Sequence, residues 1–108
     1  MVIGRMKAAA FFLLLALIGC PAAAAPLPDV ERPNFAMSNE VIASLDATID
    51  HLRAAEKNVP ESWQIGRALD NCKDVRRTIA QWPDVGAYDP RGAERLWNDC
   101  QSTYRAVR

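Results

Sequence analysis

Asp46, Asp50 and His51 are the residues whose types and spacing come nearest to a metal site. Two carboxylates four positions apart share one face of a helix, and imidazole is a common metal ligand. On a helix, however, His51 points about 100° away from Asp50, so one helix alone does not assemble three ligands. A periplasmic metal-binding or sensing protein would need a second helix or chain to complete the site, and solvated surface residues are the alternative interpretation.

The residue sets that support catalysis are incomplete. The serines lie outside nucleophile-elbow sequences, and His51 is the single histidine. The glycines after the N-terminal region are scattered, so no phosphate-binding loop is predicted. No pair of acids stands out, and a small helical domain offers little cleft to raise a carboxyl pKa. We therefore expect a protein that is not an enzyme and that uses no cofactor.

Cys72 and Cys100 are each fourteen residues from Gly86. If two helices form an antiparallel hairpin folded about Gly86, the two cysteines lie level with each other and face inward, as a disulfide requires. Two free buried thiols are the alternative, and a catalytic thiol is disfavoured because the chain has no Cys-x-x-Cys sequence. The same register pairs apolar residues along both helices: Val75 with Trp97, Ile79 with Ala93, Ala68 with Tyr104, and Ile65 with Val107.

Three helices are predicted to position these residues. The first spans residues 39–57, with Ser38 as its N-cap and Asn58 and Pro60 at its end. The second begins near Pro60 and stops at Pro83. The third begins at Asp89-Pro90. Each carries one apolar stripe at helical spacing: Val41, Ile42, Leu45, Ile49 and Leu52; Ile65, Ala68, Leu69, Cys72, Val75, Ile79 and Trp82; Ala93, Leu96, Trp97, Cys100, Tyr104 and Val107.

The predicted fold is therefore all-α, with a small helical domain over residues 38–108. A helical hairpin is joined by a Cys72–Cys100 disulfide, and the preceding helix packs across it. Residues 20–37 contain four prolines, which resist helix and remove amide donors, so they are predicted to form a flexible tether.

The N-terminal residues are typical of a cleaved secretory signal. Arg5 and Lys7 precede an apolar run of eleven residues, Ala8–Ile18. At about 1.5 Å per residue, this run is roughly half of what a bilayer-spanning helix needs. The basic flank, the short apolar run and the small residues that follow it indicate export.

Two cleavage sites are predicted for this signal. Leu17-Ile18-Gly19-Cys20 resembles the bacterial lipobox, which implies cleavage after residue 19, a lipid on Cys20 and an outer-membrane lipoprotein. Ordinary cleavage in Ala22-Ala23-Ala24-Ala25 instead removes residues 1–24 and gives a protein free in the periplasm or secreted. Both alternatives leave Cys72 and Cys100 as a pair in an oxidising compartment.

Charge is distributed unevenly along the chain. Arg5 and Lys7 leave with the signal, so eleven bases face thirteen acids, which argues against binding to nucleic acid. Residues 29–61 carry a net charge of −4, and residues 62–108 carry +2. The second helix holds a predicted interaction face, with an aromatic residue opposite its apolar stripe and four bases on its outer side: Trp63, Arg67, Lys73, Arg76 and Arg77.

Two alternatives apply to that face. The acidic first helix could neutralise the bases within the fold, and Trp63 could cover the end of the core. The leading functional hypothesis is a small exported, non-enzymatic protein that binds another protein or a cell-wall or membrane surface. The other hypotheses are an inhibitor or immunity-type protein that blocks an exported enzyme, and the metal-binding protein described above. A membrane is expected as a partner only through a lipid on Cys20, and the sequence leaves the oligomeric state open.

Overall fold

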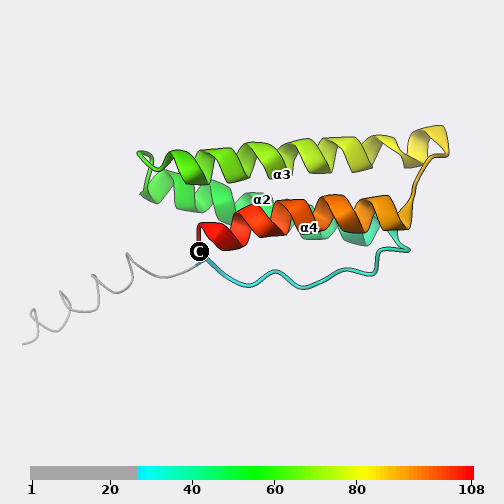
Figure 1. Cartoon of the computed structure of the whole chain (residues 1–108), viewed down its shortest axis with the longest axis horizontal. Helices are drawn as coiled ribbons and strands as arrows, with labels where there is room; N and C mark the ends of the chain where they lie inside the picture. Colours follow the sequence, from blue (N-terminus) through cyan, green and yellow to red (C-terminus); the bar gives the residue numbers. More distant parts are fainter. Residues whose placement is uncertain (1–26) are drawn as a thin grey trace, which may run out of the picture.

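The computed structural model describes residues 27–108, which form three packed α-helices and one short 3₁₀-helix (Figure 1). Helix α2 spans Ser38–Asn58, α3 spans Trp63–Gln81, η1 spans Pro83–Val85 and α4 spans Pro90–Ala106. No strand occurs within residues 27–108, so the predicted all-α fold is confirmed. The predicted export signal and Cys20 lie outside the described residues.

The start of α4 agrees with the sequence prediction, and the start of α3 differs from it. At α4, Asp89 accepts a hydrogen bond from the Arg91 amide and Pro90 is the first helical residue, as predicted. Helix α3 begins at Trp63 rather than near Pro60, because Pro60 lies in the turn that follows α2 and Ser62 is the cap. The Ser62 hydroxyl accepts from the Ile65 amide at 3.4 Å.

The cap predicted at Ser38 is wrong. Ser38 is already the first residue of α2, and Met37 stands at the N-cap with no side-chain hydrogen bond. A turn from Asn34 to Met37 leads into the helix, and the Met37 carbonyl accepts from the amides of Glu40 and Val41. The chain thus enters α2 through backbone bonds of this turn, and no serine cap is needed.

The core consists of the three predicted apolar stripes. Fourteen apolar residues are buried, among them both cysteines, and most of the remaining stripe residues are partly buried against them. The core also contains a polar contact that the stripes do not predict: the Gln101 amide donates to the Thr48 hydroxyl at 2.9 Å. Thr48 in turn donates to the Ser44 carbonyl at 3.0 Å, so both buried polar side chains have partners across α2 and α4.

The hairpin register predicted about Gly86 is confirmed. Cys72 and Cys100 form a disulfide between α3 and α4, with their Cα atoms 4.8 Å apart. Gly86 adopts a φ of +67° in the connection between the two helices, a conformation that residues with a Cβ adopt at a cost. The register places the first turn of α3 beside the last turn of α4 (Figure 1).

Residues 27–37 form an extended segment, here called the strap, which runs antiparallel to α4 along the helical body (Figure 1). Leu27, Val30 and Phe35 are partly buried against the core. The ring of Phe35 meets that of Trp97 edge-on at a centroid distance of 5.5 Å, and the Arg32 guanidinium lies 4.9 Å from the Phe35 centroid. The flexible-tether interpretation is therefore wrong for residues 27–37, because apolar side chains between the prolines pack on the helices.

Hydroxyl groups of the helical body hold the strap by its backbone. Proline-containing segments leave carbonyl oxygens without intrasegment donors, and side-chain hydroxyls can satisfy them. Two ion pairs add side-chain contacts: Arg108–Asp29 near the start of the strap and Arg32–Glu94 at its middle. Three hydroxyls donate to strap carbonyl oxygens: Tyr104 to Pro28, Ser44 to Glu31, and Tyr88 to Phe35.

The disulfide should dominate the stability of this small body. Replacing both cysteines, Cys72→Ala with Cys100→Ala, should lower the free energy of unfolding by about 3.5 kcal/mol, the chain-entropy estimate for a loop of this length. Urea unfolding followed by circular dichroism measures the change. A loss below about 1 kcal/mol would show that the helices keep their register without the bond.

The two tyrosines should make the strap sensitive to alkaline pH. Burial and, more weakly, Asp89 raise the pKa of Tyr88 above its ordinary value near 10. Burial also raises the pKa of Tyr104, with Asp29 adding to this effect and Arg108 opposing it. Because the protonated hydroxyls donate to the strap, their contribution is complete below the unfolded-state pKa and is lost as pH rises through the higher folded-state pKa.

A Tyr88→Phe, Tyr104→Phe double variant isolates the contribution of the two hydroxyls, because the variant and the wild type have the same lysines and these titrate equally in both. At neutral pH the variant should be less stable by about 1 kcal/mol per hydrogen bond. Above about pH 10 the difference should shrink, because the wild type then loses the same bonds. Urea unfolding at several pH values measures this difference, and a gap that stays constant with pH would contradict the assignment.

Candidate functional site

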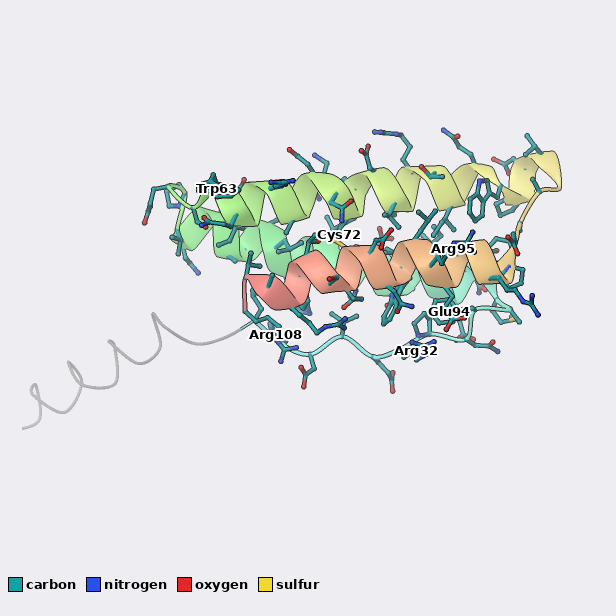
Figure 2. The ribbon with its side chains drawn as sticks, viewed as in Figure 1. Arg32, Trp63, Cys72, Glu94, Arg95 and Arg108 are labelled. Atoms are coloured by element: carbon teal, nitrogen blue, oxygen red, sulfur yellow. A yellow bond between two sulfur atoms is a disulfide. The ribbon has the colours of Figure 1, made fainter. Side chains whose placement is uncertain are left out.

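Trp63 is the most exposed aromatic residue of the described chain, with 65% of its surface accessible. It lies in the first turn of α3, at one end of the helical body (Figure 2). Because its side chain meets solvent rather than the core, the interpretation that Trp63 covers the end of the core is wrong. Ile65, two residues later, takes the inward position instead.

A shallow groove lies beside Trp63, between the start of α3 and the end of α4. Small side chains at Ala68 and Ala106 leave the space, and the disulfide register brings the two helices together there. Thr103 is fixed on one wall, since its hydroxyl donates to the Cys100 carbonyl at 2.8 Å and accepts from the Asn71 amide at 3.3 Å. The groove is lined by Trp63, Gln64, Arg67, Ala68, Thr103, Ala106 and Val107.

Arg67 is the charged residue of this groove. It lies one helical turn after Trp63 and is exposed, and it forms no ion pair with any residue from 27 to 108. The groove therefore combines an indole surface, an aliphatic wall and a guanidinium group. This set can bind a ligand that is both apolar and anionic.

The remaining bases of the predicted face lie elsewhere. Lys73, Arg76 and Arg77 line a hollow on the side of α3 that faces α2, together with residues of α2 that include Asp46 and Asp50. The structure thus separates the predicted face into the Trp63–Arg67 groove and this second surface.

Two of the four bases that line the second surface are in ion pairs within the described residues. Arg76 donates to both carboxylate oxygens of Asp46, at 2.8 and 3.4 Å, and Arg77 pairs with Asp74. Of these two pairs, only Arg76–Asp46 joins the acidic first helix to the hairpin, since Asp74 belongs to α3 itself. Lys73 is exposed and takes part in no ion pair within the described part of the chain.

The residues considered for a metal site are dispersed. Asp46 is engaged by Arg76, while His51 is near Tyr104, with ring centroids 6.4 Å apart. Asp50 lines the second surface, whereas His51 lines a hollow under the strap. Over residues 27–108, no three side chains of the His, Cys, Asp and Glu types are close enough to hold a metal ion.

A third concave region lies between the strap and α2. Its central polar group, the Ser44 hydroxyl, donates to the Glu31 carbonyl and accepts from the Trp97 indole N–H at 2.9 Å. Arg32 is paired with Glu94. These groups already hold the strap, whereas Arg67 of the Trp63 groove takes part in no ion pair within the described residues.

Sequence reasoning identified only one wall of the Trp63 groove. Trp63 and Arg67 were predicted, but Thr103, Ala106 and Val107 were not assigned to a binding surface. The hairpin register could have placed these three residues beside Trp63, because it pairs Ile65 with Val107 and Ala68 with Tyr104.

No family model, curated protein or solved structure matches this chain. Over residues 27–108, none of the helices has the length and apolar character needed to span a membrane.

The Arg76–Asp46 pair should contribute little to stability, since its side chains are 40% and 50% exposed. In a double-mutant cycle with Asp46→Asn and Arg76→Gln, we expect a coupling energy below about 1 kcal/mol, measured by urea unfolding. A coupling above about 2 kcal/mol would show that this pair fixes the packing of α2 on α3.

Proposed function

We propose that this protein is a small exported, non-enzymatic protein that binds another component of the cell envelope through the Trp63 groove. The observation that carries the proposal is the exposure of Trp63 beside an apolar wall and beside Arg67, which forms no ion pair with residues 27–108. Tryptophan and arginine are the residue types most enriched at binding hot spots.

Rigidity supports this role. The wall residues of the groove belong to two helices that the disulfide joins, and Thr103 and Asn71 hydrogen-bond across the same interface. A surface whose parts are held in place before binding loses less entropy on association. The fold therefore presents Trp63 on a pre-organised surface.

The disulfide also supports export. Structural disulfides persist in oxidising compartments, and the N-terminal sequence predicts delivery to such a compartment. The cell envelope and its surroundings are accordingly where we expect the partner.

Photo-crosslinking in the native cell tests this proposal. A photoreactive phenylalanine analogue at Gln64, an exposed residue of the groove, should form an adduct that is lost when Trp63→Ala is added. Binding through the groove predicts this dependence, because the probe reports proximity and Trp63 supplies the contact. Mass spectrometry of the crosslinked peptide identifies the class of partner.

The matched control places the same analogue at Val85, which is 74% exposed in η1 at the opposite end of the body (Figure 1). Adducts confined to position 64 would support the proposal. Absence of an adduct there, equal adducts at both positions, or adducts that persist with Trp63→Ala would each overturn it.

A further inference from the structure

Four chain segments meet at the end of the body that carries Trp63. Helix α2 ends there, α3 begins there, α4 ends there, and the strap begins there at Leu27 (Figure 1). Trp63 and Arg108 both lie at this end in Figure 2, and Arg108 pairs with Asp29 of the strap. We call this region the Trp63 end.

The strap sets the length of chain that precedes the folded body. Because residues 27–37 pack on the helices, the body begins at Leu27 rather than at Ser38. Only the six residues 21–26 lie between it and Cys20. Fully extended, the seven Cα–Cα steps from Cys20 to Leu27 reach at most about 25 Å. A lipid on Cys20 would therefore keep the Trp63 end close to the membrane.

Charge differs between the two ends of the body. The Trp63 end has three exposed bases, Lys57, Arg67 and Arg105, none of which is in an ion pair with residues 27–108. The bases at this end outnumber the acids by one, when Arg108, Asp29, Glu56 and Glu61 are included. Counted to the same depth of five helical residues, the opposite end carries four acids and two bases: Glu40, Asp84, Asp89, Glu94, Arg77 and Arg91.

We propose that the Trp63 end docks on the surface of an anionic phospholipid bilayer. The indole of Trp63 enters the interfacial region, where amphipathic aromatic rings are favoured, and Lys57, Arg67 and Arg105 face the lipid phosphates. This inference rests on the proposed function, since it names the envelope component that the Trp63 groove binds.

Two observations favour a bilayer over a protein as the partner. The N-terminal chain leaves the body at the Trp63 end, and this end is more positively charged than the opposite end. A bilayer surface is planar and anionic, so it selects the end that combines an exposed tryptophan with unpaired bases. The opposite end also exposes apolar residues, Met37 and Val85, but acids outnumber bases at that end, and an anionic surface repels a negative charge.

Co-sedimentation with vesicles tests the proposal. The chain beginning at Pro21 keeps every described residue and lacks Cys20, so no lipid chain contributes to binding. It should bind vesicles of phosphatidylglycerol in phosphatidylcholine and should bind phosphatidylcholine vesicles weakly. Tryptophan emission should shift to shorter wavelength on binding, because Trp63 moves from water into the interface.

Variants at the two ends give a matched comparison. Trp63→Ala should weaken partitioning about tenfold and abolish the emission shift. Arg67→Ala should weaken partitioning about fivefold, and salt should reduce the binding of the parent protein. Val85→Ala and Arg91→Ala, the apolar and basic controls at the opposite end, should bind as the parent does.

Three results would overturn the docking proposal: no preference for phosphatidylglycerol, partitioning unchanged by Trp63→Ala, or an equal loss with Arg91→Ala. A different outcome is no preference for phosphatidylglycerol vesicles while the probe at Gln64 still forms a Trp63-dependent adduct with a protein. In that case the proposed function stands and a protein is the partner. If both experiments fail, both proposals fail.

Discussion

The Cys72–Cys100 cross-link is the constraint on which the rest of this structure depends. A body of this size has a core of only fourteen buried apolar residues, and small cores leave little net stability. The bond closes a separation of 28 residues and fixes how α3 and α4 align. That alignment brings the start of α3 against the end of α4, so the groove beside Trp63 follows from it.

The strap adds a second constraint, which determines where the N-terminal chain departs. Three of its backbone carbonyl oxygens accept from tyrosine and serine hydroxyls, and these hydrogen bonds do not depend on the identity of the strap side chains. Phe35, packed on Trp97, is the main apolar contact. Together they carry the chain along α4 and bring Leu27 to the same end of the body as Trp63.

Charge pairing explains why the exposed bases are not equivalent. Arg76 and Arg77 have acid partners from α2 and from their own helix, whereas Arg67 has none within the described chain. Paired, half-exposed charges contribute little to attraction for an external ligand. Lys73 on the second surface also takes part in no ion pair within the described chain, so the feature that distinguishes the Arg67 groove is the exposed Trp63 beside it.

The sequence by itself determined the helices, their apolar stripes and the pairing of Cys72 with Cys100, because helical periodicity and hairpin symmetry are local or nearly local properties. Only the tertiary structure decided the place of the strap, since Pro28 and Phe35 contact residues more than fifty positions away. It also decided the exposure of Trp63 and separated Arg67 from Arg76. These outcomes depend on which helix lies on each side of α3, and periodicity within one helix carries no information about its neighbours.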